Sequence, residues 1–235
     1  MLPLGDRNPT STFPAVTLAL LGLNVAAYFL FQHGTLSLGD PGGREYLCNL
    51  VDYAAVPREL TEPGFELRAR RCPGEPPSQW LTPLTSMFMH GGLLHLGGNM
   101  LFLWIFGNNI EDAMGHVKFL AFYLLGGVAA LALQVLVDPS SAVPTIGASG
   151  AVAAVLGGYI LLYPRARVWT FVFIVVLPIP ALVVLGFWFL QQLAFGYFGL
   201  TEVTAGAGES GGVAYFAHIG GFAFGLLTVR VWVRR

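Results

Sequence analysis

Three short segments of this sequence place histidine, asparagine and serine side chains among glycines, in otherwise apolar surroundings. They are His90-Gly-Gly-Leu-Leu-His95-Leu-Gly-Gly-Asn99, Gly147-Ala148-Ser149-Gly150 and Ala217-His218-Ile219-Gly220-Gly221. A serine hydroxyl beside a histidine can be activated as a nucleophile. Two donors aimed near that serine, such as His95 and Asn99 at i and i+4 on one helix face, can stabilise an oxyanion. The three segments therefore predict acyl-transfer chemistry, provided that the fold brings them together.

Each segment by itself has an ordinary structural explanation. Ser149 between glycines is typical of a helix cap, and His218 could be a hydrogen-bonded core histidine or line a channel. His95 and Asn99 could be a structural pair. The chemical interpretation depends on all of them lying at one depth, where an unpartnered polar group is costly. No acidic residue is placed to orient His218, so we predict a Ser149–His218 dyad without a third carboxylate.

The composition predicts that the elements positioning these residues lie in a membrane. Of the 235 residues, 55% are hydrophobic and only 11% are charged, whereas soluble domains carry about 25% charged residues. The mean hydropathy of +0.66 agrees. The same composition argues against a disordered chain. The net charge of −1 offers no basic surface for nucleic acid.

Charged residues divide the chain into six apolar windows, and a transmembrane helix needs roughly 20 apolar residues. We predict helices at about residues 13–32, 93–111, 117–137, 149–163, 179–198 and 213–232. The fold class is therefore an all-α polytopic membrane protein, in a single domain over residues 1–235. The first window is longer than the apolar core of a cleaved signal peptide, so we expect a retained helix.

The fifth window is too long for one helix and contains Pro178 and Pro180. Proline disfavours helix at the preceding residue, so we place the fifth helix at Ile179–Phe198. Val168–Leu177 is then an interfacial or re-entrant segment. One long tilted helix is the alternative.

Basic residues collect in the segments on one side of the membrane, which predicts that both termini are cytoplasmic. The exception is a long outer loop at about residues 33–80, which could form a small subdomain. Its cysteines, Cys48 and Cys72, are either a disulfide or two free thiols. The sequence shows no organelle-targeting segment, so we expect a multi-pass protein of a prokaryotic inner (plasma) membrane.

This topology brings the three polar segments to one depth. The second, fourth and sixth helices all begin at the outer side, where the three segments lie. A fourth helix over Ser149–Tyr163 spans roughly 22 Å at ~1.5 Å per residue, less than the ~30 Å hydrocarbon core. Ser149 should therefore lie below the outer surface, beside a wet cavity that opens to the extracytoplasmic side.

Small residues predict which helices touch. Two helix faces carry them: Ser149, Ala153 and Gly157 on the fourth helix, and His218, Gly221 and Gly225 on the sixth. Small faces let transmembrane helices approach closely. If these two faces meet, Ser149 and His218 come within hydrogen-bond distance.

Together these motifs resemble the rhomboid family of intramembrane serine proteases. The resemblance covers about Trp80–Arg230. It rests on H-x-x-x-x-H-x-x-x-N at residues 90–99, G-x-S-G at 147–150, A-H-x-x-G-x-x-x-G at 217–225 and Gly-Asn-Asn-Ile-Glu-Asp at 107–112. It implies a six-helix rhomboid bundle. One departure is that Trp80 is followed by Leu81, where the family often has a Trp-Arg pair.

The resemblance implies Ser149 as the nucleophile and His218 as the general base. It implies an oxyanion hole from His95, Asn99 and the Ser149 backbone N–H, with His90 in a structural role. Substrates would be transmembrane proteins, mostly single-pass, cut within or next to the lipid bilayer. No metal or cofactor is involved.

The resemblance also implies which residues shape the site and control access to it. Four glycines would shape it: Gly147, Gly150, Gly221 and Gly225. Phe187–Phe189 and the glycine-rich loop Thr201–Gly212 would gate lateral access from lipid. Lipid-facing bulk is the alternative explanation for Phe187–Phe189.

Three other functions compete with a protease. A catalytically silent relative would usually lack the serine or the histidine, and both are present. A transporter or channel would need a mid-membrane carboxylate to couple ions or protons, whereas the polar set is confined to the outer leaflet. A purely structural membrane protein would leave the buried histidine and asparagine unexplained.

Overall fold

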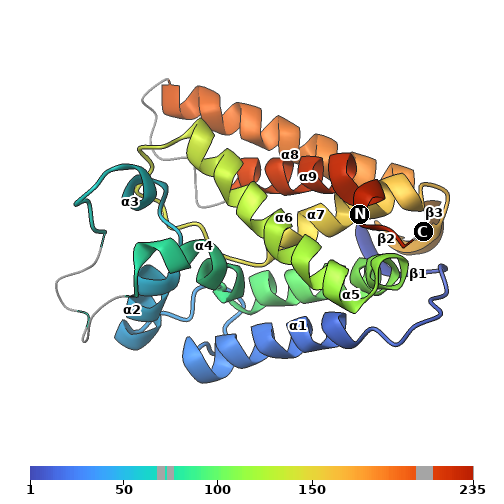
Figure 1. Ribbon diagram of the computed structural model, residues 1–235, viewed down its shortest axis with the longest axis horizontal. Helices are drawn as coiled ribbons and strands as arrows, with labels where there is room; N and C mark the ends of the chain where they lie inside the picture. The colour runs from blue at the N-terminus through green and yellow to red at the C-terminus, as the bar shows by residue number, and fades with distance from the viewer. Residues whose placement is uncertain (68–71, 73–76, 205–213, 235) are drawn as a thin grey trace.

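The computed structural model describes residues 1–67, 72, 77–204 and 214–234. Its long helices pack side by side in a bundle, with α7 near the centre (Figure 1). They are α1 (Ala15–Ala26, continued by a π-helical turn over Ala27–Phe31), α5 (Leu93–Met114), α6 (His116–Val137), α7 (Ser149–Leu162), α8 (Ala181–Thr204) and α9 (Tyr215–Trp232). Each of these six helices overlaps one of the predicted ranges, and the protein is mostly helical, as predicted.

Two segments of the described helices are long and apolar enough to cross a membrane by length and composition. They are His116–Val137 and Ala181–Gly199. Ala15–Phe31 and Ser149–Leu162 are also apolar but shorter. Six membrane crossings therefore stay a prediction.

The two chain termini lie at the same end of the bundle, and helices α2 (Arg44–Tyr53) and α3 (Pro57–Thr61) lie at the opposite end (Figure 1). The helices α5, α7 and α9 begin toward the α2–α3 end. The three polar segments of the sequence are thus gathered in one half of the bundle.

Helix α7 forms the centre of the core. Every residue from Gly150 to Tyr159 is buried, and the helix is apolar on all sides, as expected for one surrounded by others. It packs against α5, α6 and α9. The N-terminus of this buried helix is where Ser149 lies.

The all-α expectation is wrong in one region, because three strands form a small antiparallel sheet. These are β1 (Leu2–Asp6), β2 (Arg167–Val172) and β3 (Val175–Pro180), in the order β1-β2-β3. The sheet lies at the end of the bundle where the termini are (Figure 1).

Residue types explain why this part of the fifth window is not helical. Valine, isoleucine, phenylalanine and tryptophan dominate 168–177, and these residues favour strands. Pro178 and Pro180 lie on β3, an edge strand, where a missing N–H is tolerated. The fifth helix consequently begins at Ala181 rather than Ile179. The alternative of one long tilted helix is also wrong.

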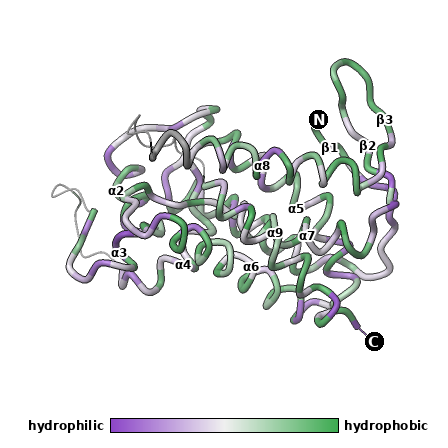
Figure 2. Tube along the Cα trace, turned by 90° about the horizontal axis from the view of Figure 1, so that it is seen from above, coloured by the Kyte–Doolittle hydropathy of each residue, from purple (hydrophilic) through white to green (hydrophobic). Residues whose placement is uncertain are grey.

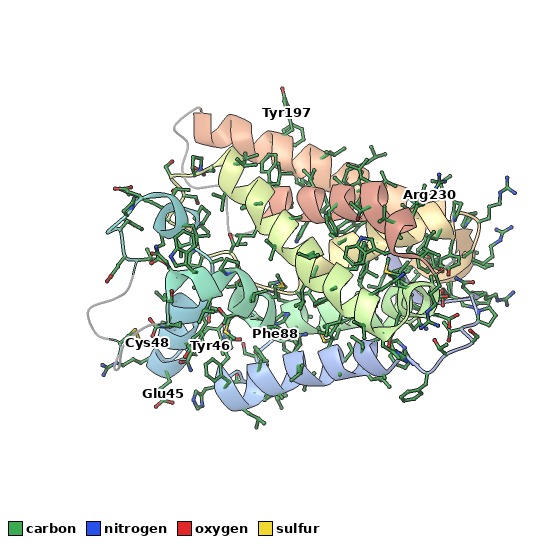
Figure 3. All side chains as sticks on the ribbon, in the orientation of Figure 1. Glu45, Tyr46, Cys48, Phe88, Tyr197 and Arg230 are labelled. Atoms are coloured by element: carbon green, nitrogen blue, oxygen red, sulfur yellow. A yellow bond between two sulfur atoms is a disulfide. The ribbon has the colours of Figure 1, made fainter. Side chains whose placement is uncertain are left out.

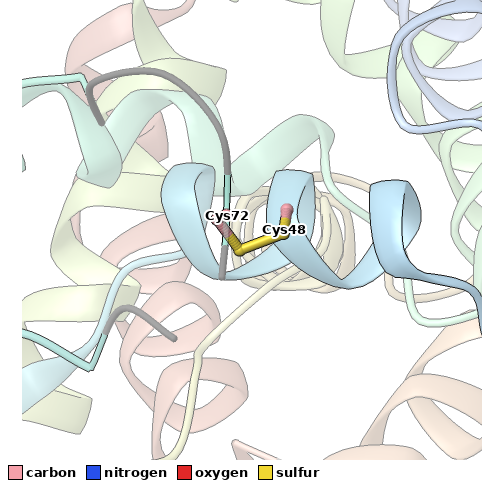
Figure 4. The surroundings of a disulfide bond; sticks show 2 residues. All are labelled: Cys48 and Cys72. Carbon is pink, nitrogen blue, oxygen red and sulfur yellow. A yellow bond between two sulfur atoms is a disulfide. The ribbon is translucent and has the colours of Figure 1, made fainter. Parts of the chain in front are cut away.

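The described part of the predicted outer loop contains α2 and α3 and leads into a 3₁₀ turn at Gln79–Leu81. The short helix α4 (Thr82–Thr85) and a second 3₁₀ turn at Ser86–Phe88 follow it. We refer to these short elements together as the outer subdomain. Cys48 on α2 is disulfide-bonded to Cys72, with their Cα atoms 5.4 Å apart (Figure 4). Of the two alternatives for these cysteines, the structure contains the disulfide.

A buried carboxylate joins the first helix to the rest of the bundle. Glu111 on α5 is fully buried and accepts hydrogen bonds from the Val16 N–H, the Thr17 N–H and the Thr17 hydroxyl, at 2.7 to 2.8 Å. It also contacts His116 Nδ1. The first N–H groups of a helix have no intrahelical acceptor, so Glu111 satisfies the start of α1.

We expect Glu111→Ala to destabilise the bundle, because it leaves the Thr17 N–H and hydroxyl buried without an acceptor. The cost should be about 3 kcal/mol, since each unsatisfied buried group costs ~1–3 kcal/mol. Thermal unfolding in detergent micelles measures it. Glu111→Gln is the matched control, because it keeps an acceptor oxygen and should lose less. Equal stability of the alanine variant and the wild type would contradict this account.

Candidate active site

The approach of α7 and α9 brings the serine and histidine of two separate motifs together. Ser149 is the first residue of α7, and His218 lies in the first turn of α9. Ser149 Oγ is 2.7 Å from His218 Nε2, which is hydrogen-bond distance. This is the pairing that the two small-residue faces predicted.

Glycine permits this close approach. A Cβ atom added at Gly221 would overlap the carbonyl of Gly150 on α7, and one at Gly225 would overlap the carbonyl of Ala154. From the other side, a Cβ at Gly157 would overlap the carbonyl of Phe222. The backbones of α7 and α9 are therefore in direct contact, a spacing that side chains larger than hydrogen would prevent.

A third residue contacts the histidine, and the sequence analysis missed it. His218 Nδ1 lies 2.9 Å from Gln192 Oε1 on α8, and Gln192 is 7% exposed. The sequence analysis expected no carboxylate beside His218 and named no other partner, and the group at this contact is an amide oxygen. A signal existed in the sequence, because a glutamine inside an apolar helix is itself costly.

His95 on α5 directs an N–H group toward the serine motif. Its Nδ1 accepts a hydrogen bond from the Gly91 N–H at 3.2 Å, so the proton of the neutral ring lies on Nε2. Gly147 has a φ of +107°, and a Cβ there would lie 2.7 Å from His95 Nε2. The His95 Nε2–H group therefore borders the backbone just before Ser149.

Asn99 and the Ser149 backbone supply two further donors at the same place. Asn99 Nδ2 is buried and donates to no acceptor within the described part of the chain. It would lie 3.4 Å from a Cβ at Gly147. The Ser149 N–H belongs to the first turn of α7, where N–H groups lack intrahelical acceptors and the helix dipole favours negative charge.

These groups line one cavity of about 390 Å³. His95, Asn99, Ser149 and His218 are on its wall together with apolar side chains, among them Leu94, Phe102, Val152 and Trp188. An apolar chain segment could therefore reach the serine, with its polar backbone facing the donors.

His90 holds the start of α5 in place. Its ring is fully buried, and its backbone exchanges two hydrogen bonds with the Gln32 side chain at 2.7 and 2.9 Å. The Tyr46 hydroxyl donates to the His90 carbonyl, and His90 Nδ1 lies 3.3 Å from the Phe88 carbonyl. Tyr46 and Phe88 are labelled in Figure 3. Through these contacts the π-helical end of α1 and the outer subdomain position the first motif.

The outer subdomain also holds the loop that precedes Ser149. Ala55 and Thr145 exchange two backbone hydrogen bonds, at 2.8 and 3.1 Å, and the Gly147 N–H donates to the Ser86 carbonyl at 2.8 Å. Gly150 packs against Ala130 of α6, where no Cβ would fit. The irregular backbone at this depth therefore has partners, as buried backbone requires.

The aromatic residues proposed as a gate differ from one another. Phe187 is half exposed, which fits lipid-facing bulk. Trp188 has its ring 5.9 Å from the His218 ring, and Phe189 stacks on Phe222 at 4.2 Å. The predicted loop Thr201–Gly212 is wrong at its start, because α8 continues to Thr204, and residues 205–212 lie outside the described residues.

Trp80 and Leu81, at the departure from the family pattern, are both exposed. Within the described ranges, no three His, Cys, Asp or Glu side chains are grouped as metal ligands would be.

Comparison with known proteins identifies the family. The Rhomboid domain matches residues 77–235, which is more than half of the chain. The chain therefore belongs to the rhomboid family, a family of membrane-embedded proteins, and the resemblance drawn from its motifs is confirmed.

Individual relatives cover the same region. Rhomboid protein 1, mitochondrial, of Saccharomyces cerevisiae is 35% identical over 153 residues, which are 60% of this chain and 39% of the relative. RHOMBOID-like protein 4 of Arabidopsis thaliana is 35% identical over 144 residues, 61% and 32% of the two chains. Rhomboid protease GluP of Bacillus subtilis is 29% identical over 150 residues, 64% and 24%. The matched part is thus well under half of each relative's length.

We expect Gly221→Ala to separate Ser149 from His218, because the added methyl group would overlap the Gly150 carbonyl. Overpacking of this kind costs ~1–3 kcal/mol. Thermal unfolding should show that loss, and labelling by a serine-directed fluorophosphonate should fall at least tenfold. Gly186→Ala on α8 is the matched control, since nothing lies within 4 Å of a Cβ there. Normal labelling of Gly221→Ala would refute the requirement for close helix contact.

Proposed function

We propose that this protein is an intramembrane serine endopeptidase that cleaves transmembrane proteins, mostly single-pass, within or next to the bilayer. The observation that carries the proposal is the 2.7 Å separation of Ser149 Oγ and His218 Nε2 on the wall of a cavity that His95 and Asn99 also line. Membership of the rhomboid family supports it, as does the protease named among the relatives.

The proposed topology has six membrane helices in one domain over residues 1–235. Both termini would be cytoplasmic, and the active site would open to the extracytoplasmic side of an inner (plasma) membrane. The position of both termini at one end of the bundle supports an even number of crossings (Figure 1). The disulfide Cys48–Cys72 at the other end suits an oxidising compartment.

The reaction would begin with proton transfer. A substrate segment enters from lipid and unwinds at the cavity, which exposes its scissile carbonyl. His218 Nε2 takes the proton of the Ser149 hydroxyl, and Ser149 Oγ attacks the carbonyl carbon. His218 then gives that proton to the leaving amine, which produces an acyl-enzyme.

Three donors would stabilise the oxyanion of the tetrahedral intermediate. They are His95 Nε2–H, Asn99 Nδ2–H and the Ser149 backbone N–H. Donors of this kind are worth roughly 2.7–4 kcal/mol each in soluble serine proteases. Water from the outer cavity would then hydrolyse the acyl-enzyme, with His218 again as the base.

The first test is labelling of the membrane-embedded protein with a serine-directed fluorophosphonate probe. We expect the wild type to be labelled, and Ser149→Ala and His218→Ala to abolish labelling, because one removes the nucleophile and the other its base. Ser140→Ala, an exposed serine near the start of the loop before α7, is the control that should label normally. A correctly folded wild type that does not label would favour a catalytically silent relative.

A further inference from the structure

We propose that Gln192 is a positioning residue that fixes the tautomer and the ring orientation of His218. The inference rests on the proposed function, because it concerns the same serine–histidine pair. Gln192 lies on α8, outside the sequence motifs on α5, α7 and α9. It would be an uncharged third residue beside Ser149 and His218.

The two ring nitrogens of His218 each have one partner. Nε2 faces Ser149 at 2.7 Å, and Nδ1 faces Gln192 Oε1 at 2.9 Å. A histidine that accepts the serine proton on Nε2 must carry its own proton on Nδ1. An oxygen acceptor at Nδ1 favours that tautomer and holds the ring plane toward the serine.

The orientation of the Gln192 amide follows from its own surroundings. Its Nε2 lies 3.5 Å from the Trp188 carbonyl of the preceding turn, and its side chain is buried. With the amide NH₂ directed at that carbonyl, Oε1 is directed at His218. The reverse orientation would leave the Gln192 carbonyl facing the Trp188 carbonyl, with no donor between them.

The charges around His218 explain why an amide suits this position. Among the described residues that line the cavity, His95 on α5 is the other titratable group, and none is acidic or a lysine or arginine. The Trp188 ring of α8 lies 5.9 Å from the His218 ring. A carboxylate buried here would carry a charge in apolar surroundings, which is costly in a membrane. An amide oxygen accepts the same hydrogen bond without that charge.

The test compares Gln192→Leu, Gln192→Glu and wild type in the full chain in lipid vesicles, through the rate of fluorophosphonate labelling as a function of pH. We expect Gln192→Leu to slow labelling about tenfold or more, because a buried N–H loses its acceptor. The lower inflection of its labelling rate plotted against pH should move to lower pH, since the imidazolium of His218 is less stabilised. Gln192→Glu should restore labelling and move the inflection to higher pH. Gln191→Leu, an exposed neighbour on α8, should behave as wild type.

A second readout needs no activity. Nitrogen-15 NMR of labelled histidines should show His218 as the Nδ1–H tautomer in Ser149→Ala protein, and a tautomer mixture once Gln192→Leu is added. An unchanged tautomer, or slower labelling with an unchanged pH profile, would overturn the inference in favour of a packing role. Wild type that fails to label while NMR shows the Nδ1–H tautomer would overturn the protease function and leave this hydrogen bond standing.

An independent observation concerns the β2–β3 hairpin. Its tip residues Phe173 and Ile174 are 92% and 89% exposed, and the hairpin is strongly hydrophobic (Figure 2). It projects sideways from the end of the bundle, rather than beyond it along the long axis. A continuous apolar surface of this kind marks a contact with a membrane or a partner.

We infer that the occupant is the lipid bilayer, with the hairpin tip at the headgroup–acyl boundary of the leaflet on the side of the termini. This inference rests on the proposed topology, in which the hairpin connects two membrane helices, α7 and α8, and its base therefore lies at the membrane surface. Three exposed arginines surround that base: Arg7, Arg165 and Arg167. Basic groups beside an apolar tip match phosphate headgroups above acyl chains. The hairpin thereby anchors the start of α8, which carries Gln192.

Site-directed spin labelling tests this inference. Ile174→Cys is labelled with a nitroxide, the native cysteines being paired, and the protein is placed in phosphatidylcholine–phosphatidylglycerol vesicles. We expect high accessibility to oxygen and low accessibility to a nickel chelate, as for Leu227→Cys on the exposed face of α9. Ser140→Cys, outside the helices, should show the reverse. Chelate accessibility equal to that of Ser140→Cys would overturn the inference. Protection from both reagents, as expected where a second copy of the chain covers the tip, would overturn it as well.

Discussion

The direct backbone contact between α7 and α9 is the constraint on which the site depends. Gly221 meets the Gly150 carbonyl and Gly225 meets the Ala154 carbonyl, with no room for a Cβ at either glycine. Apolar burial gives no preference between helix pairs when lipid is equally apolar, so shape decides the pairing. Because Ser149 begins one of these helices and His218 lies in the first turn of the other, the packing that joins the helices also sets the 2.7 Å distance between their reactive atoms.

Several polar groups inside the bundle satisfy the hydrogen bonds of other segments. Glu111 satisfies the start of α1, and Gln32 satisfies the backbone of His90. Asn99 Nδ2, by contrast, is buried without an acceptor in the described part of the chain. A buried donor without an acceptor lowers the stability of the fold. This donor borders the cavity beside Ser149, where a substrate oxygen could accept its hydrogen bond. His90 Nε2 and the Tyr123 hydroxyl are likewise buried without a partner in the described part of the chain, so it is the position of Asn99 on the cavity wall that distinguishes it.

Elements outside the helical core complete the geometry. The outer subdomain pairs Ala55 with Thr145 and accepts the Gly147 N–H through Ser86, so the irregular segment before Ser149 is held from outside the core. At the other end, the sheet and its hairpin lead directly into α8. That helix carries Gln192, which contacts His218. The outer subdomain and the sheet therefore support the site from opposite ends of the bundle.

The sequence alone indicated the membrane class and the approximate helices, and it pointed to Ser149, His218, His95 and Asn99 as candidate site residues, because hydropathy, charge and glycine spacing are local properties of the chain. It also indicated the α7–α9 contact, since small residues at helical spacing mark a face. The tertiary structure alone decided the hairpin at 168–180, where strand pairing with β1 overrides a hydropathy pattern that suits either helix or strand. It alone decided the Cys48–Cys72 pairing and the role of Gln192 as a partner of His218, because both depend on which distant segments lie side by side, and spacing within one segment carries no such information.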